Sequence, residues 1–458
     1  MPQKNETPTR VCVIGLGYVG LPLAVALARA GHDLLGFDTD PHRIRELRDG
    51  NDRTGEVDMD AADASSLALT GDESALADRD IYIVTVPTPV DGENRPDLEA
   101  VLAASASVGR ALAKSKARAS LPIVAFESTV YPGVTEDICG PAIEAASGKK
   151  RSRDFLLGYS PERINPGDRT HGLAQIVKVV AGENEDATRR LERLYGSVTK
   201  AGVFVARNIR TAEAAKVIEN AQRDVNIAFV NEIAMIFAKL GLSVDDVLEA
   251  ARTKWNFLDF RPGLVGGHCI SVDPYYLAFC AAQLGHEAEI ILAGRRINDD
   301  MGAWISDRIA DAYEGGGGGT GDAAGRSESA ANVRPPRTLV LGLAFKENVP
   351  DIRNTRVELL VTRLATRGHQ VEVHDALADA TEAKNFYGIE LCDALDATGD
   401  AGGGAPFDCL VAAVAHNEYR ALADEDFVRL VRPGGLIADV KGIWRDRALP
   451  GNVRRWQL

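Results

Sequence analysis

The chain has 458 residues, of which 45% are hydrophobic and 26% are charged, a composition typical of a globular protein with more than one core. Its formal net charge of −14 argues against nucleic acid and anionic membrane surfaces as partners. No apolar run approaches the length of a membrane span, and the polar N-terminus shows no signal peptide, so we expect a cytoplasmic protein.

The cysteines are scattered along the chain and form no CxxC pair; they are Cys12, Cys139, Cys269, Cys280, Cys392 and Cys409. This spacing indicates reduced thiols, with neither a disulfide framework nor a zinc site. His268 stands beside Cys269, but no second Cys or His lies at ligand spacing, so we expect no metal.

The N-terminal segment reads as strand, turn, helix and strand. Residues 11–15 form a short apolar run that predicts a buried strand, and an apolar helix follows the turn GLGYVG. The next strand ends in Asp38, and further strands are expected at 80–86 and 122–129. Strands that alternate with helices predict a parallel, doubly wound sheet.

The turn carries the pattern Gly15-x-Gly17-x-x-Gly20, with Tyr18 and Val19 between the glycines. Such glycines permit a tight turn and let a pyrophosphate approach the N-terminus of the helix. An acid, Asp38, stands where the next strand ends and can bind a ribose hydroxyl, which favours NAD over NADP. The alternative is a nucleotide-free fold of the same kind.

A long helix is predicted from about residue 212 to residue 240, without Gly or Pro and with apolar residues along its whole length. Such a helix buries two faces, as a spine between domains or at a dimer contact. Lys216 and Asn220 are four residues apart and share one face. Their spacing favours a solvated polar stripe, and the alternative is that they line a site and stabilise an oxyanion. The helical pattern resumes around 275–313.

Residues 314–336 are a Gly-rich, low-complexity stretch that we expect to be a flexible linker, and 396–404 looks like a surface insertion. A second α/β unit follows the linker, with a strand from residue 337, a helix at 355–367, and strands at 370–375, 408–415 and 434–440. The fold class is therefore α/β, with two Rossmann-like doubly wound domains joined by a central long-helix dimerisation domain. The expected division is 1–207, 208–313, 314–336 and 337–458.

Three loop segments carry candidate chemistry. Cys269 lies in GGHC, a setting built for close approach of the backbone, and the residues alone leave a structural and a reactive thiol open. Glu162 and Thr129 lie in loops after strands, where doubly wound proteins carry function, although a role in a surface turn explains either. Lys346 and Arg353 offer cations near a helix start, which suits a diphosphate or, alternatively, a solvated basic turn.

The chain resembles the UDP-glucose/GDP-mannose dehydrogenase family over nearly its whole length. The motifs that carry this resemblance occur in the family's order: VIGLGYVGLPLA, TPVDGENRPDL, ESTVYPGVTE, SPERINPGD, AAKVIEN, GGHCISVDPYYL and GLAFKENVPDIRNTR. Within the family, TKWNFLDFRPGLVGGHC is most similar to the UDP-N-acetylglucosamine and UDP-N-acetylgalactosamine 6-dehydrogenases of capsule and O-antigen synthesis.

The resemblance implies an NAD-dependent, four-electron oxidation of the C6 hydroxyl of a UDP-N-acetylhexosamine to the uronic acid. Cys269 would be the nucleophile that carries a thiohemiacetal and then a thioester. Lys216 and Asn220 would stabilise oxyanions, and Asp273 would act with Lys216. Glu162 would act in thioester hydrolysis, and Thr129 would position the water.

The resemblance also implies the binding residues. NAD would contact the turn Gly15, Gly17, Tyr18, Val19 and Gly20 together with Asp38, Thr88 and Thr129. The UDP-sugar would contact Glu162, Arg163, Lys216, Asn220, Phe260, Arg261, Gly266, Lys346 and Arg353. The Gly-rich linker and the insertion depart from the family's usual pattern and put only loop geometry in doubt. We expect a homodimer through the central helix.

Other functions remain open at this point. A UDP-N-acetylmannosamine or UDP-glucose 6-dehydrogenase would use the same residues, although Arg261 argues against the N-acetylmannosamine branch. A two-electron hydroxyacid dehydrogenase would share the Rossmann unit and the helical spine but needs no thiol. A non-catalytic nucleotide-sugar sensor would have little need for Cys269, Lys216, Asn220, Glu162 and Asp273 together.

Overall fold

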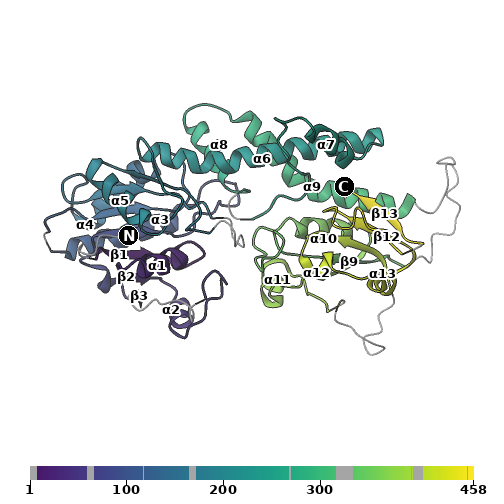
Figure 1. Cartoon of the computed structure of the whole chain (residues 1–458), viewed down its shortest axis with the longest axis horizontal. Helices are drawn as coiled ribbons and strands as arrows, with labels where there is room; N and C mark the ends of the chain where they lie inside the picture. Colours follow the sequence, from purple (N-terminus) through teal and green to yellow (C-terminus); the bar gives the residue numbers. More distant parts are fainter. Residues whose placement is uncertain are drawn as a thin grey trace. The chain divides into compact units, whose positions relative to one another are not determined.

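The computed structural model describes residues 8–58, 67–116, 118–164, 172–267, 270–315, 334–393, 395, 406–450 and 452–458. The chain forms two compact units, Met1–Ala221 with Val272–Ala288, and Gln222–Ser271 with Glu289–Leu458 (Figure 1). Each unit contains its own β-sheet, and the long helix α6 (Ile209–Leu240) belongs in part to both. The predicted α/β fold with two Rossmann-like sheets and a long helix is confirmed.

The first unit is built on an eight-stranded sheet in the order β3-β2-β1-β4-β5-β6-β7-β8. Its strands are β1 (Arg10–Ile14), β2 (Asp33–Phe37), β3 (Leu67–Thr70), β4 (Ile81–Val84), β5 (Ile123–Phe126), β6 (Leu156–Tyr159), β7 (Lys178–Gly182) and β8 (Val203–Val205). The order of the first six strands is that of dinucleotide-binding domains, in which the strand order reverses between the parallel neighbours β1 and β4. Strand β7 is antiparallel to β6, so this sheet is mixed rather than wholly parallel.

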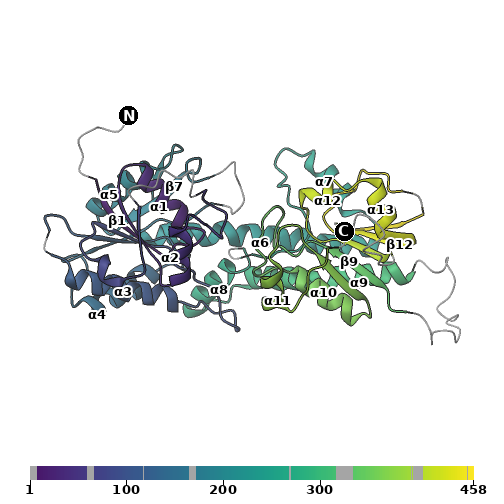
Figure 2. The same cartoon turned by 90° about the horizontal axis from the view of Figure 1, so that it is seen from below.

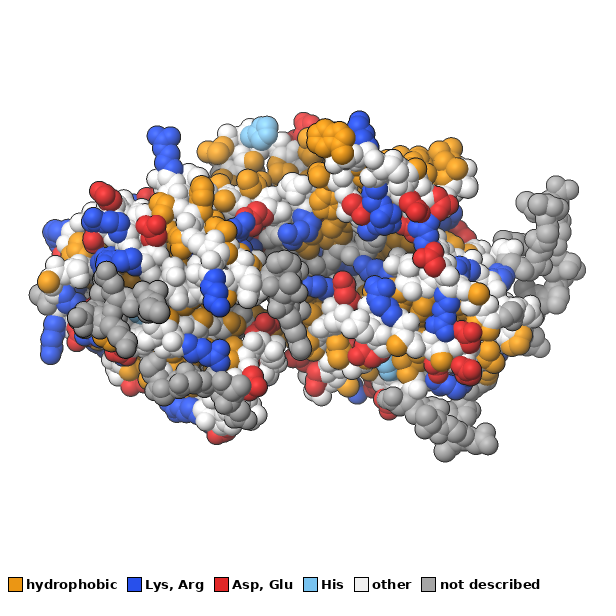
Figure 3. Space-filling view, in the orientation of Figure 1, with side chains coloured by type: hydrophobic (Ala, Val, Ile, Leu, Met, Phe, Trp, Pro, Cys, Tyr) orange, Lys and Arg blue, Asp and Glu red, His pale blue; other side chains and the backbone are white. Residues whose placement is uncertain are grey.

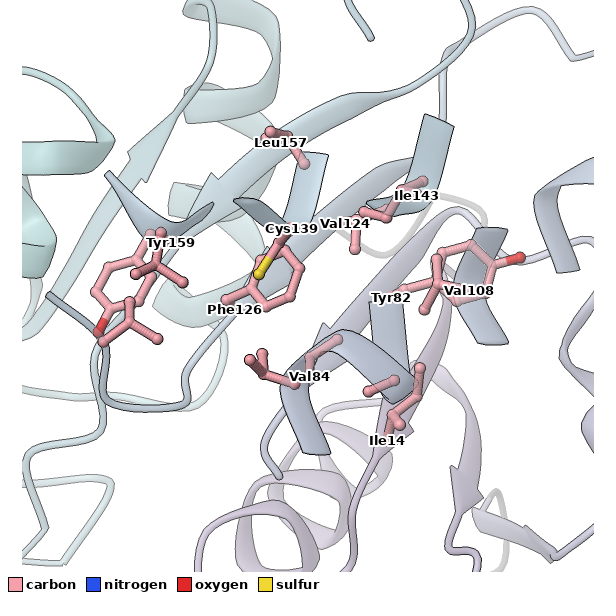
Figure 4. Close-up of a cluster of buried hydrophobic side chains, with 14 of the residues drawn as sticks. Ile14, Tyr82, Val84, Val108, Val124, Phe126, Cys139, Ile143, Leu157 and Tyr159 are labelled. Carbon is pink, nitrogen blue, oxygen red and sulfur yellow. The ribbon is translucent and has the colours of Figure 1, made fainter. Parts of the chain in front are cut away.

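Helices cover both faces of this sheet. They are α1 (Gly20–Arg29), α2 (Pro41–Arg48), a 3₁₀ turn η1 (Glu73–Leu76), α3 (Glu99–Lys114), a π-helical segment η2 (Val134–Cys139), α4 (Gly140–Ser147), α5 (Glu185–Gly196) and α8 (Asp273–Gln283). Alternate residues of each buried strand point to opposite faces. Ile14, Val84 and Phe126 therefore pack with α3 and α4 (Figure 4), whereas Val13 and Ile83 pack with α1 and α5.

The second unit is built on a five-stranded parallel sheet in the order β10-β9-β11-β12-β13, the other common doubly wound order. Its strands are β9 (Arg337–Leu341), β10 (Gln370–His374), β11 (Phe407–Ala412), β12 (Val431–Asp439) and β13 (Arg454–Gln457). Its helices are α7 (Val244–Arg252), α9 (Glu289–Gly315), α10 (Val357–Thr366), α11 (Ala380–Tyr387), α12 (Asn417–Arg420) and α13 (Asp424–Leu430). Figure 2 shows α9 and α10 on one face of this sheet and α12 and α13 on the other.

The predicted long helix is present as α6, which is longer than expected because it begins at Ile209. The helical pattern predicted over 275–313 is instead two helices, α8 and α9. They are separated at Gly285, whose positive φ of 74° ends the first one. Most of the predicted linker and the whole predicted insertion lie outside the described residues. Among the helices that the structure describes, none combines the length and apolar content required to cross a membrane.

Candidate functional site

The glycine turn after β1 is shaped by two close contacts. Gly15 has a φ of 93°, and its N–H donates to the carbonyl of Phe37 at 2.8 Å, which ties the turn to the end of β2. A Cβ on Gly20 would lie 1.8 Å from the carbonyl oxygen of Gly15, so only glycine fits there. Thr85, at the end of β4, donates its hydroxyl to the Gly15 carbonyl at 2.7 Å. Sequence reasoning missed Thr85, because nothing in its local pattern indicates this long-range contact.

The rest of the turn fits a dinucleotide. A Cβ on Gly17 would meet no described atom within 4 Å, so the space above this residue is open. Val19 is the N-cap of α1, Tyr18 precedes it, and among the described residues no side chain caps this end of the helix. An uncapped helix N-terminus beside an open glycine suits an anionic pyrophosphate. The geometry of the turn is thus compatible with the NAD contacts predicted for it, which stay a prediction.

Asp38 is held in the position predicted for a ribose-binding acid. Its Oδ2 accepts the N–H of Leu16 at 2.8 Å, and its Oδ1 accepts the N–H of Asp40 at 2.9 Å. Each carboxylate oxygen has about two acceptor positions, so each can accept another hydrogen bond. The half-buried carboxylate is thus fixed to the glycine turn and can accept hydroxyl groups.

Thr88 and Thr129, both predicted to contact NAD, lie next to each other. The hydroxyl of Thr88 donates to the carbonyl of Thr129 at 2.7 Å, which joins the loops after β4 and β5. The phenol of Tyr276 on α8 donates to the carbonyls of Thr88 and Pro89 at 2.9 and 3.1 Å. Helix α8 therefore holds the loop after β4 in place through Tyr276.

Lys216, Asn220 and Asp273 form a buried polar cluster. The amide of Asn220 donates to Oδ2 of Asp273 at 2.5 Å, and the ammonium of Lys216 lies 3.9 Å from the same oxygen. Their exposed fractions are 7%, 5% and 1%, respectively. The solvated stripe that spacing alone favoured is therefore wrong, because these side chains of α6 face Asp273 at the start of α8.

Glu162 lies in a second buried cluster at the carboxyl ends of β5 and β6. Its Oε2 accepts from the ammonium of Lys178 at 3.1 Å, and its Oε1 accepts the N–H groups of Arg163 and Ile164, each at 2.6 Å. Lys178 also pairs with Glu127 at 2.7 Å. The predicted substrate contact Arg163 forms an ion pair with Glu219 of α6 at 2.8 Å.

The two carboxylates of this cluster differ in pKa. Burial raises the pKa of Glu127 to about 7, although Lys178 opposes this rise. Burial would also raise the pKa of Glu162, but Lys178 and the two backbone amides outweigh it and lower that pKa. A lowered pKa favours the ionised form of Glu162, which can accept hydrogen bonds. Sequence reasoning missed Glu127 and Lys178, although both are charged residues at the ends of apolar strands.

In the second unit, the two glycines before His268 pass close to another backbone segment. A Cβ on Gly266 would lie 2.6 Å from the carbonyl oxygen of Asn354, and one on Gly267 would lie 2.7 Å from the ring of Phe345. The N–H of Gly267 donates to the same Asn354 carbonyl at 3.2 Å. The close backbone approach predicted for this loop is thus present, and the segment after β9 makes it.

The loop is also fixed at Gly263 by Asn231 of α6. The side chain of Asn231 accepts the N–H of Gly263 at 2.8 Å and donates to the carbonyl of Gly263 at 3.1 Å. It donates further to Asn298 of α9 at 2.8 Å, and Asn298 donates to Asp224 at 2.7 Å. Both asparagines are fully buried, so a polar network in the packed α6–α9 pair positions the loop.

The predicted substrate residues of the second unit differ in what they already contact. Phe260 is half-buried against the small core of α6 and α7, and Arg261 pairs with Asp245 at 2.7 Å. Arg353 forms a two-pronged pair with Asp351, at 3.0 and 2.8 Å, so its guanidinium is directed to a carboxylate. Lys346 is half-buried in the segment after β9.

A cavity of about 410 Å³ opens beside this loop. Its lining includes four cations, from Arg252, Arg261, Lys441 and Arg445, and three carboxylates, from Asp245, Glu249 and Asp446. Burial lowers the pKa of Lys441, whose ammonium would lie 3.3 Å from a Cβ on Gly263. Sequence reasoning missed Lys441, although it lies two residues after the end of strand β12, at the edge where a doubly wound sheet binds ligands.

The second sheet repeats the turn geometry of the first. The N–H of Gly342 donates to the carbonyl of His374 at 2.7 Å, and Asp375 accepts the N–H of Leu343 at 2.6 Å. Asp375 accepts more hydrogen bonds than Asp38. It also accepts the backbone N–H groups of Ala344, Leu377 and Ala378, and it accepts a hydrogen bond from the imidazole of His416. Nδ1 of His416 accepts the N–H of Asn348 at 2.9 Å, so Nε2 carries the proton given to Asp375.

Cys269, the predicted nucleophile, lies outside the described residues, as does His268. Among the described cysteines, burial raises the pKa of Cys12, Cys139 and Cys409 to about 12 and also raises that of Cys280. These four thiols are poorly ionised at neutral pH. Within the described ranges, no three His, Cys, Asp or Glu side chains gather into a metal-binding group.

Comparisons with known proteins agree with this geometry. Three domains of the UDP-glucose/GDP-mannose dehydrogenase family match in order: the NAD binding domain at 9–199, the central domain at 210–300 and the UDP binding domain at 339–446. Protein CapL of Staphylococcus aureus is 44% identical over 448 residues, covering 98% of this chain and 99% of CapL. The UDP-N-acetyl-D-glucosamine 6-dehydrogenase of Pseudomonas aeruginosa is also 44% identical, over 94% of this chain and 96% of that protein.

Solved structures agree as well. A UDP-D-ManNAc dehydrogenase from Pyrococcus horikoshii superimposes with a TM-score of 0.81 at 29% identity, covering 98% of this chain and 99% of the other. A UDP-glucose dehydrogenase from Pyrobaculum islandicum gives a TM-score of 0.82 at 26% identity, covering 99% of each chain. The chain is therefore an NAD-dependent member of the UDP-glucose/GDP-mannose dehydrogenase family.

Proposed function

We propose that the chain oxidises the C6 hydroxyl of UDP-N-acetylglucosamine, or of its C4 epimer UDP-N-acetylgalactosamine, to the uronic acid. The observation that carries this proposal is the 44% identity to a UDP-N-acetyl-D-glucosamine 6-dehydrogenase along almost the whole of both chains. The mannosamine dehydrogenases that match are 30–31% identical. A capsule or other surface polysaccharide would use the product, as the likeness to CapL suggests.

The domains would divide the work. Residues 1–207 would bind NAD, 208–313 would carry the catalytic loop, 314–336 would link, and 337–458 would bind the UDP moiety. Asp38, Thr88, Thr129 and the glycine turn would hold NAD, which accepts a hydride in each of two oxidations. Lys346, Lys441 and the loop 260–267 would hold the nucleotide.

The cysteine chemistry would proceed on Cys269. Its thiolate would add to the C6 aldehyde, forming a C–S bond, and the second hydride loss would leave a thioester. Water then adds to the carbonyl carbon, the C–S bond breaks, and the thiolate leaves as the acid forms. The water gives up a proton in this step. Glu162 is the carboxylate that would accept a hydrogen bond from this water and orient it.

Lys216 and Asn220 would stabilise the oxyanions that form in both addition steps. Their burial makes each hydrogen bond to a developing negative charge stronger than it would be in water. Asp273 already accepts from Asn220 and lies near Lys216, so it would orient both donors. A cluster of this kind has a clear use in stabilising anions and no comparable use in a sensor.

A homodimer would form through α6. Ile218, Phe229, Ile236 and Leu240 are 53%, 58%, 46% and 64% exposed, and their spacing of 11, 7 and 4 residues places them on one face of the helix. Figure 3 shows apolar side chains on the surface in the region of α6 and α7. Trp255, which follows α7 in the chain, is 92% exposed. We also propose a cytoplasmic location, where the thiols stay reduced.

The test is NADH formation at 340 nm with limiting sugar and excess NAD. Four substrates are compared: UDP-GlcNAc, UDP-GalNAc, UDP-ManNAc and UDP-glucose. Two NADH per sugar from UDP-GlcNAc or UDP-GalNAc are expected, and Cys269→Ser should abolish turnover while NAD binding is retained. One NADH per sugar, or full turnover by the serine variant, would refute the thioester route.

A further inference from the structure

The residues behind Glu162 form a buried chain of charges that extends across three strands. Lys178, the first residue of β7, contacts Glu127 at the end of β5 and Glu162 after β6, at 2.7 and 3.1 Å. The phenol of Tyr195 on α5 donates to the other oxygen of Glu127 at 2.6 Å. The side chains of Glu127 and Lys178 are 0% and 2% exposed, so this chain lies inside the protein.

The ammonium of Lys178 is directed by several fixed groups. Besides the two carboxylates, it donates to the carbonyl of Pro161 at 3.2 Å, which uses its three N–H bonds. It also lies 5.2 Å from the centre of the Tyr195 ring. A lysine held in this way has lost its usual rotamer freedom, and it can act as a fixed point charge toward Glu162.

The bonding of Glu162 leaves one acceptor position open. A carboxylate has about four acceptor sites. The described residues fill two sites on Oε1, with the N–H groups of Arg163 and Ile164, and one on Oε2, with Lys178. The side chain is 12% exposed, so the fourth site is accessible to a small donor such as water.

The charges around Glu162 favour its ionised form. The described groups that face it are the ammonium of Lys178 with Glu127 and Tyr195 behind it, and the ion pair of Arg163 with Glu219 on α6 beside it. The cluster holds two carboxylates and one ammonium. Without the ammonium, two buried carboxylates would compete for one proton.

From this geometry we propose that Lys178, anchored by Glu127 and Tyr195, is a positioning residue that keeps Glu162 ionised and oriented for thioester hydrolysis. This inference rests on the proposed function, because it assigns a partner to the residue that acts on the hydrolytic water. In that step the carbonyl carbon gains the water oxygen and loses the cysteine sulfur. Glu162 accepts a hydrogen bond from the water, and the released proton ends on the thiolate.

The decisive variant is the double substitution Glu127→Gln with Lys178→Met. It removes one buried carboxylate and one ammonium, so the cluster keeps its net charge and the fold is expected to survive. Glu162 keeps its two backbone N–H bonds but loses the ammonium. The single variant Glu127→Gln keeps the ammonium of Lys178 and leaves Glu162 as its one carboxylate partner among the described residues. Lys150→Met, which breaks an exposed pair with Glu144, is the matched control.

The first readout is the pH profile of kcat. We expect the acid limb of the double variant to move up by about one to two pH units, because burial then dominates the proton affinity of Glu162. The acid limb of Glu127→Gln should lie at the wild-type pH or at a lower pH, and the acid limb of Lys150→Met should lie at the wild-type pH. A purely structural lysine would move no limb, so an unmoved limb in the folded double variant overturns the inference.

The second readout separates hydrolysis from oxidation. Stopped-flow NADH traces of the double variant should keep a burst of two NADH per active site and then slow roughly 10²-fold, the usual contribution of a positioned proton acceptor. Intact mass spectrometry should detect the acyl-enzyme on Cys269. A burst slowed as much as the steady state would place Lys178 outside hydrolysis. The wild-type enzyme tests the proposed function separately. If it forms no NADH, the proposed function is refuted, whereas a normal wild type with an unaffected double variant refutes only the role of Lys178.

Discussion

The hydrogen bonds between Asn231 and Gly263 determine how much free energy is needed to detach that loop from α6. In Asn231→Ala, the N–H and C=O of Gly263 and the side-chain oxygen of Asn298 all lose a partner. Each buried unpaired group costs about 1–3 kcal/mol, so three cost about 3–9 kcal/mol. A water molecule admitted to the space recovers part of this, which leaves about 2–4 kcal/mol.

The assay is hydrogen exchange of the peptide that contains Gly263, combined with urea unfolding. A loss of about 3 kcal/mol corresponds to exchange roughly 10²-fold faster at the Gly263 amide. Asn226→Ala is the control, because the half-buried Asn226 bonds to the carbonyl of Gln222 in its own helix, and its loss should change stability by less than about 0.5 kcal/mol. Equal effects of the two variants would refute the claim that this network holds the loop.

Three further predictions concern other positions. Gly17→Ala should leave the thermal midpoint of the NAD-free protein unchanged and weaken NAD binding, measured by calorimetry, by about tenfold or more. Gly20→Ala should lower the thermal midpoint even without NAD, because its Cβ would overlap the Gly15 carbonyl. Because burial raises the pKa of Glu213 to about 7, its contribution to stability is present below about pH 4.5 and is lost as the pH rises through 7. Glu213→Gln should therefore reduce the fall in urea midpoint between pH 5 and pH 8, and an unchanged fall would exclude this carboxyl as its source. Lys441→Met should raise the KM for the UDP-sugar about tenfold with kcat changed less than twofold, and an equal fall in kcat would contradict a binding role.

Local signals in the sequence predicted much of the fold. The turn around Gly15 and Gly20 was predictable because its strand, glycines, helix and acid lie within about thirty residues and obey one geometry. The glycines before Cys269 were correctly associated with close backbone approach, but the partner, Asn354, lies far along the chain. No local pattern identifies such a partner.

The parts that were not predicted depend on tertiary burial. Lys216 and Asn220 have a spacing that fits a solvated stripe, and only the packing of α8 against α6 shows that they are buried. The pKa of Glu162 falls because Lys178 reaches it from a strand sixteen positions later, which no periodicity indicates. Charged residues inside apolar strand sequences are the signal that could have found this cluster.

The paired turns of the two sheets have a consequence for stoichiometry. Asp38 and Asp375 occupy equivalent places after the second strand of each sheet, yet five donors already surround Asp375. A carboxylate has about four acceptor sites, so no site remains for a ribose hydroxyl. The C-terminal sheet thus has a similar strand–turn–acid geometry, but its acid has no acceptor site left for a ribose hydroxyl. Each chain should titrate with a single equivalent of NAD, and adenine nucleotides should not compete for the C-terminal sheet.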